Sequence, residues 1–181
     1  MALWGISTSD ESKPKYLNQE DKNNCIAKPE GWVLKKTVGS RNLEEVLVAV
    51  GSNTDLGTTL GAATISAVHF DATTYAQGDT GKVVVVYNEN VNVTNGATLT
   101  VTATGGSNPT ATAAAQTGVN KAEFTFTVPS RTHTLSIGAQ TISGTIVDAT
   151  GGAASDKGIV AGDVIDAGGA GDGGTETISV A

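Results

Sequence analysis

The stretch Tyr75–Val101, YAQGDTGKVVVVYNENVNVTNGATLTV, decides the fold of this chain. Its apolar run KVVVVYN is typical of a strand that is buried on both faces. The segment Asn88–Asn90 (NEN) interrupts this strand before VNVT resumes in alternation, which predicts a β-bulge or a change of sheet. The pair Asn95–Gly96 then predicts a type I′ hairpin turn that leads into ATLTV.

Short strands recur around this stretch, separated by turn residues and without a helical period. From Thr64 onward the runs are TISAVHF, KVVVVYN, VNV, TLTVTAT, AEFTFTV, HTLSI and TISGTIV. This spacing is typical of an antiparallel β-sandwich. We therefore predict an all-β fold, with the sandwich over residues 64–154.

The segments on either side of the sandwich differ from it in composition. Residues 1–30 are polar and are interpreted as an extended arm, and 31–50 as a β-hairpin, which makes 1–50 one N-terminal unit. The Gly- and Thr-rich residues 51–63 are interpreted as a linker. The Gly-rich tail 155–181 is predicted to form loops, with TETISV as a candidate edge strand.

The charge of the chain is unevenly distributed. The 181 residues include 11 Lys and Arg and 18 Asp and Glu, which gives a formal net charge of −7. Residues 1–50 are neutral overall, so the excess of acid lies in residues 51–181. Phosphate binding needs clustered Lys and Arg, so nucleic acid and anionic membranes are not expected as partners. The apolar runs are too short to span a bilayer, and the first residues do not fit an export signal.

The sandwich stretch resembles the repeated bacterial Ig-like domains of large surface proteins. Those domains share a Y-x-x-G-D turn before a β run, then an acidic residue before V-x-V, then a T-L-T-type strand. The matching positions here are Tyr75, Gly78, Asp79, Glu89, Val91, Val93, Leu99 and Val101. The similarity continues through FTFTV, LSI and GTIVDATGGAA. It implies an Ig-like sandwich with a presenting or adhesive role, and it carries no catalytic residues.

The N-terminal third resembles a segment in virion structural proteins of marine tailed phages, namely cyanophages and their T4-like relatives. The similar residues are MALWG at the start, Pro14–Tyr16, Gly31–Trp32 and the segment Glu45–Val50. With a single Ig-like module, this implies a capsid decoration protein at the virion surface, assembled in the host cytoplasm. Its partners would be the major capsid protein or other virion proteins, and a homo-oligomer such as a trimer is expected. A neck, tail or fibre position stays open.

The candidate docking residues are the large rings of the N-terminal unit, Trp4, Tyr16 and Trp32. Such rings need an apolar partner, and buried aromatic residues contribute a large share of the binding energy of interfaces. The alternative function is a carbohydrate-binding or adhesive module of a tail fibre or a bacterial surface protein. The sandwich has few rings, and some of them must fill its core, which counts against this alternative.

Residues that could perform catalysis or bind metal are few. His69 and His133 lie on predicted strands without a nucleophile motif, and Cys25 has no histidine nearby, so we predict no enzyme activity. The absence of Cys-x-x-Cys or paired-histidine spacing argues against a structural zinc site. The weaker cofactor hypothesis is calcium bound by carboxylates at strand ends, with the candidates Asp71, Asp79, Glu89 and Asp148. Turn formation is the simpler interpretation of these four residues.

Overall fold

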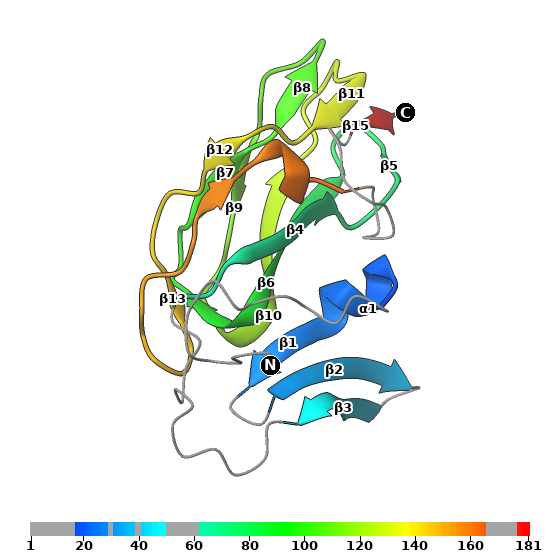
Figure 1. Cartoon of the computed structure of the whole chain (residues 1–181). Helices are drawn as coiled ribbons and strands as arrows, with labels where there is room; N and C mark the ends of the chain where they lie inside the picture. Colours follow the sequence, from blue (N-terminus) through cyan, green and yellow to red (C-terminus); the bar gives the residue numbers. More distant parts are fainter. Residues whose placement is uncertain (1–16, 29–30, 39–40, 50–61, 166–176) are drawn as a thin grey trace.

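The computed structural model describes residues 17–28, 31–38, 41–49, 62–165 and 177–181. Figure 1 shows a small N-terminal sheet at one end of the molecule and a larger β-sandwich that extends away from it. Within the described residues, regular helix is confined to one six-residue α-helix and one short 3-10 turn. The predicted all-β class is therefore confirmed.

The N-terminal unit consists of a helix and a three-stranded antiparallel sheet in the order β1-β2-β3. Its elements are α1 (Gln19–Asn24), β1 (Cys25–Lys28), β2 (Gly31–Val38) and β3 (Arg41–Ala49). The pairing of β2 with β3 confirms the predicted hairpin. The prediction of an extended arm is wrong for residues 17–28, because the Asn18 side chain caps α1 through the Asp21 amide, 2.7 Å away, and Cys25 and Ile26 are buried in the sheet.

The remaining elements form the sandwich and its connections. They are β4 (Ile65–Phe70), β5 (Thr74–Tyr75), β6 (Thr80–Val93), β7 (Thr98–Thr100), β8 (Thr102–Thr104), β9 (Thr110–Thr112), β10 (Gln116–Thr127), β11 (Thr134–Ser136), β12 (Gln140–Thr141), β13 (Ile146–Asp148), β14 (Gly158–Ile159), η2 (Ala161–Asp163) and β15 (Thr177–Val180). One sheet has the order β13-β6-β10-β9-β7, with β4 also paired to β6. The other has the order β5-β15-β11-β8, and β12 pairs with β14.

The long strand β6 changes its partner at NEN. Along one edge it pairs with β4 up to Tyr87, and beyond NEN the same edge pairs with β13. Along the other edge the register with β10 shifts between the pairs Lys121↔Val86 and Val119↔Val91, so that residues 87–90 bulge. The predicted bulge is confirmed, and the partner strand changes there within one sheet.

The apolar run of β6 is buried because both of its faces are covered. Val83 and Val85 belong to the main sandwich core, and Val84 and Val86 pack in a second cluster with Ala67 and Ile165. The main core also holds three rings in edge-to-face contact, with centroids 6.0–6.2 Å apart; they are Phe70, Tyr75 and Phe126. This geometry is favourable for aromatic groups.

The prediction of a type I′ hairpin at Asn95–Gly96 is wrong. Gly96 has a φ of 84°, but Asn95 does not adopt the positive φ that a type I′ turn requires. The turn is closed by the bond from the Ala97 amide to the Thr94 carbonyl, at 3.3 Å, and β7 pairs with β9 rather than with β6. Leu99 of β7 is buried in the core, which favours pairing of β7 with β9 over a local hairpin with β6.

The C-terminal tail takes part in the sandwich instead of forming only loops. Strand β15 lies between β5 and β11, so it is an internal strand and not the predicted edge strand. Ile159, Val164 and Ile178 belong to the main core. The sandwich therefore extends beyond its predicted end at Ala154. The sequence did not indicate this because the partners of these residues are distant in the chain.

Candidate functional site

The N-terminal sheet has its own small apolar cluster. Leu17, Cys25, Trp32 and Leu34 are all less than 9% exposed, and Leu47 packs against them. These side chains cover one face of the sheet. The cluster makes the N-terminal sheet a packed unit rather than a hairpin in solvent.

Strand β3 is the most exposed part of this unit. The side chains from Asn42 to Val46 are exposed, with Leu43 at 49% and Val46 at 51%. Its two carboxylates form ion pairs with lysines of the same sheet, Glu44 with Lys28 of β1 and Glu45 with Lys36 of the adjacent β2. Because these pairs are exposed, they contribute little to stability but balance the charge of the strand.

A lysine joins the N-terminal sheet to the sandwich. The Lys35 ammonium of β2 donates to the Asn90 Oδ1 at 3.1 Å and to the Asn120 Oδ1 at 3.5 Å. Asn90 is the last residue of NEN, and Asn120 lies on β10 between the two residue pairs that flank the bulge. Burial lowers the pKa of Lys35 below its ordinary value, and the nearby Glu44 carboxylate opposes that shift. The NEN bulge is thus a contact point between the two parts of the molecule.

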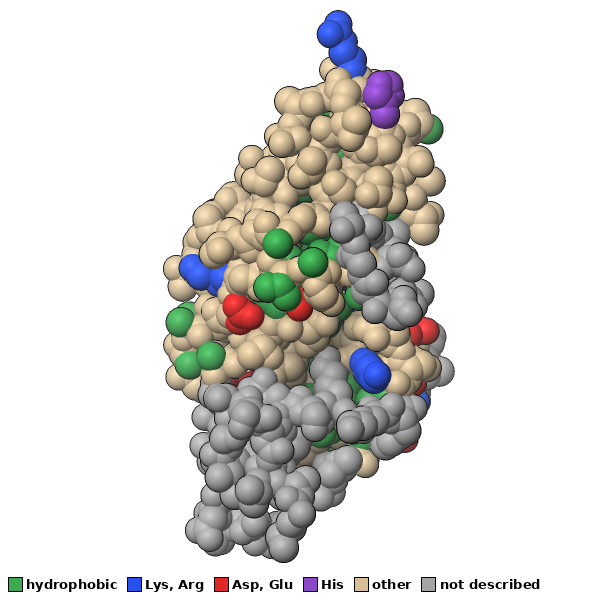
Figure 2. All heavy atoms as spheres, turned by 45° about the horizontal axis from the view of Figure 1, so that its top comes forward, with side chains coloured by type: hydrophobic (Ala, Val, Ile, Leu, Met, Phe, Trp, Pro, Cys, Tyr) green, Lys and Arg blue, Asp and Glu red, His purple; other side chains and the backbone are tan. Residues whose placement is uncertain are grey.

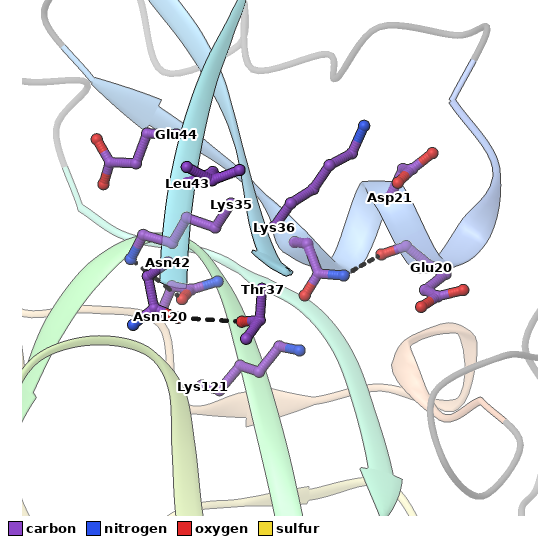
Figure 3. Close-up of a pocket in the computed structure, with 11 residues that line it drawn as sticks. Glu20, Asp21, Lys35, Lys36, Thr37, Asn42, Leu43, Glu44, Asn120 and Lys121 are labelled. Carbon is purple, nitrogen blue, oxygen red and sulfur yellow. Dashed lines mark hydrogen bonds between the residues drawn. The ribbon is translucent and has the colours of Figure 1, made fainter. Parts of the chain in front are cut away.

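A polar groove of about 740 Å³ lies beside this contact, between the N-terminal sheet and the sandwich (Figure 3). It is lined by Glu20, Asp21 and Asn24 of α1, by Lys35, Lys36 and Thr37 of β2, by Asn42, Leu43 and Glu44 of β3, and by Asn120 and Lys121 of β10. Its volume is in the range of small-molecule sites, but such sites have mostly apolar walls. Its lysines and carboxylates are equal in number, so the groove has no net charge that would select an ion.

Two of the three predicted docking rings lie outside the described residues. These are Trp4 and Tyr16. The third, Trp32, is only 2% exposed and packs in the N-terminal cluster. In this structure its ring therefore stabilises the N-terminal sheet and is not presented at the surface.

The four calcium candidates do not meet in one site. Asp71 accepts a hydrogen bond from the Tyr75 hydroxyl, and Asp79 accepts one from the Ala76 amide at 2.8 Å. Asp148 is 1% exposed and accepts from the amides of Thr150 and Gly151, whereas Glu89 is buried within β6. Across the described residues, no group of three or more His, Cys, Asp or Glu side chains is placed to hold a metal ion.

The residues considered for catalysis occupy ordinary structural positions. His69 is buried, its Nδ1 lies 2.8 Å from the Phe70 carbonyl oxygen, and burial lowers its pKa. His133 is exposed beside the start of β11, and Cys25 is fully buried.

The rings of the sandwich are buried as well. The exposed fractions of Phe70, Tyr75, Tyr87, Phe124 and Phe126 are between 0% and 8%. An exposed aromatic platform of the kind that stacks on sugar rings is therefore absent from the described part of the sandwich.

The far end of the sandwich carries one arginine and one histidine, Arg131 and His133. Arg131 is exposed next to His133. Its backbone has a φ of 66°, a value that residues other than glycine rarely adopt. The Gln77 side chain holds this loop by accepting from the Arg131 amide at 2.9 Å. Figure 2 shows basic and histidine side chains at this end, with uncharged side chains around them.

Comparisons of the chain with protein-family models, with curated proteins and with solved structures found no match. The helices in the described part of the chain are too short or too polar to cross a membrane.

The contact residues Lys35, Asn90 and Asn120 were not identified from the sequence. NEN was the one local signal, because it placed polar residues inside an apolar strand. Lys35 and Asn90 are 55 positions apart and belong to different sheets, so no local pattern links them.

Proposed function

We propose that the chain is a non-enzymatic structural protein of a tailed-phage virion, a capsid decoration protein that docks through its N-terminal unit and projects the sandwich outward. The observation that supports this proposal best is that the two ends of the molecule differ in structure. A small sheet with its own core lies at one end, and the sandwich extends from it (Figure 1). Such a division suits a protein with one attached end and one presented end.

The charge distribution is consistent with this orientation. Residues 1–50 are neutral overall, whereas residues 51–181 carry the net charge of −7. An acidic projecting part would repel the same part on neighbouring particles and so discourage clumping. A neutral docking end would approach an assembled surface without a large electrostatic penalty.

Trp4 and Tyr16 are the rings that we expect to make the docking contact. Both rings precede Leu17, which is the first described residue and belongs to the N-terminal cluster. A polar segment that binds along a partner can cover a large surface, at a cost in conformational entropy. Two rings inserted between neighbouring capsid subunits would tie those subunits together and stabilise the assembled form by mass action.

The test is a variant that lacks residues 2–16. It keeps every described element, and circular dichroism of the purified variant checks that its sheets still form. When it is expressed during infection, we expect it to be missing from purified particles, whereas the tagged full chain is present. A matched variant, Arg131→Ser at the opposite end, should be incorporated normally. Normal incorporation of the shortened chain would refute docking through residues 2–16.

A further inference from the structure

We propose that strand β3 pairs with β3 of a second copy of this chain, in antiparallel orientation, to form a continuous six-stranded sheet. This inference goes beyond the proposed function and does not depend on it, because the pairing would occur between free molecules. It identifies a self-association surface and a register for it.

The outer edge of β3 is open within the described residues. In the order β1-β2-β3, no described strand pairs with the outer side of β3, which is nine residues long. Leu43 and Val46 are two of the three large apolar side chains that are exposed among the described residues. Natural proteins often protect such an edge with charged side chains, above all lysine, or with proline. β3 contains no lysine or proline, and its charged residues are Arg41, Glu44 and Glu45.

A second copy has room to bind beside β3. β1 contacts β6 of the sandwich, and β3 is the strand of the sheet that lies farthest from the sandwich (Figure 1). A strand added beyond β3 would therefore extend away from the sandwich of the first copy. By symmetry, the same holds for the second copy.

Symmetry limits the registers that two identical antiparallel strands can adopt. A two-fold axis perpendicular to the sheet places one residue of β3 opposite itself. Centring on Glu44 or Glu45 would oppose two identical carboxylates, which is unfavourable. Centring on Val46 would place Glu45 opposite the apolar Leu47.

Centring on Leu43 avoids both problems. Leu43 then faces Leu43, and Asn42 faces Glu44 on each side of the axis. The Asn42 Oδ1 already accepts from the Thr37 hydroxyl at 3.1 Å, so its amino group is the donor for the Glu44 carboxylate of the second copy. Residues 41–45 of the two copies pair in this register. Because the contact is short, the association should be weak and concentration-dependent.

The pairing is tested with the purified full chain by sedimentation velocity and by cysteine cross-linking. The wild type should change from monomer to dimer as its concentration rises, and Leu43→Lys should stay monomeric because two ammonium groups would be opposed. Directly opposed residues in an antiparallel pair have Cα atoms at a separation that a disulfide can bridge. Leu43→Cys should therefore form a covalent dimer about tenfold faster than the controls under mild oxidation.

The controls are Val46→Cys, on the same strand but out of register, and Val160→Cys, on the sandwich. Their native side chains are 51% and 58% exposed, so their thiols should be as accessible as the one at position 43. Cys25 is fully buried and should give no background. The proposal is overturned if the wild type stays monomeric at every concentration, or if Leu43→Cys reacts no faster than either control. No particles are involved, so failure here leaves virion docking unaffected.

Discussion

The sandwich and the N-terminal sheet bury their side chains to very different extents. The sandwich encloses its five rings almost completely, and its central strand is covered on both faces. In the N-terminal sheet, Ile26 and Val33 are buried besides the four residues of the cluster, but the outer strand β3 is exposed. We therefore expect the sandwich to supply most of the stability of the chain, and we propose that the surfaces suited to assembly lie on the N-terminal sheet.

The largest effect is expected in the sandwich core, from Phe124→Ala. The ring is fully buried, and its removal should lower the free energy of unfolding by about 3–5 kcal/mol. Urea unfolding followed by circular dichroism measures this loss. The control Leu43→Ala, on the exposed strand, should change stability by less than about 0.5 kcal/mol. Equal losses in the two variants would contradict the division between the regions.

The matching change in the N-terminal cluster is Trp32→Ala. It removes a ring that is 2% exposed, but the damage should be confined to residues 17–49, because their cluster is separate from the main core. Hydrogen exchange should accelerate in that segment by two orders of magnitude or more, corresponding to about 3 kcal/mol. Amides of β6 and β10 should keep their protection. Equal acceleration across the sandwich would show that the two parts unfold together.

A smaller effect is expected from Gly81→Ala in β6. A Cβ atom there would lie 2.5 Å from the Phe126 ring, so the ring must shift, at a cost of about 1–3 kcal/mol. The control is Gly138→Ala, where a Cβ would meet nothing within 4 Å and the backbone is not left-handed. Its melting temperature should be unchanged or slightly higher. If both variants melt at the temperature of the wild type, the Phe126 ring does not pack closely against Gly81.

The contact between the two parts is tested by Lys35→Met. Methionine keeps most of the apolar stem but leaves the carbonyl oxygens of Asn90 and Asn120 without their donor, which should cost about 1–2 kcal/mol. Hydrogen exchange of the backbone amides should accelerate in residues 31–49 and not in β10. The control Lys36→Met removes an exposed ion pair and should have almost no effect. Identical exchange in the two variants would argue against the contact.

The smallest effect concerns the dependence of stability on pH. Burial raises the pKa of Tyr87 above its ordinary value of 10.0, so the folded chain keeps a proton that the unfolded chain releases. Stability should therefore fall as the pH rises above about 10. Tyr87→Phe should be less stable at pH 7, because it loses the hydrogen bond to the Asp156 carbonyl, but its decline above pH 10 should be shallower. If the stability of Tyr87→Phe falls as steeply as that of the wild type above pH 10, other groups cause the loss of stability at high pH.

Local patterns predicted a large part of the fold. The hairpin of β2 and β3, the buried run of β6 and the bulge at NEN each follow from a few adjacent residues. Helix α1 was missed because its sequence, QEDKNN, is polar and is held by a cap. Strand β14 was missed, and β15 was expected only at the edge of a sheet, because their positions depend on β12 and on β5 and β11, which precede them by many residues. For the same reason, the Lys35 contact could not be predicted.

The central claim is that the N-terminal unit contacts the virion and the sandwich points away from it. The most direct test is lysine cross-linking of purified phage particles that carry the gene for this chain. The cross-linked residues are then identified by mass spectrometry. We predict that links to other virion proteins involve the lysines of residues 1–50, such as Lys13 and Lys15, and that Lys82 and Lys157 of the sandwich form few. Links made mainly by the sandwich lysines, or particles without the chain, would contradict it.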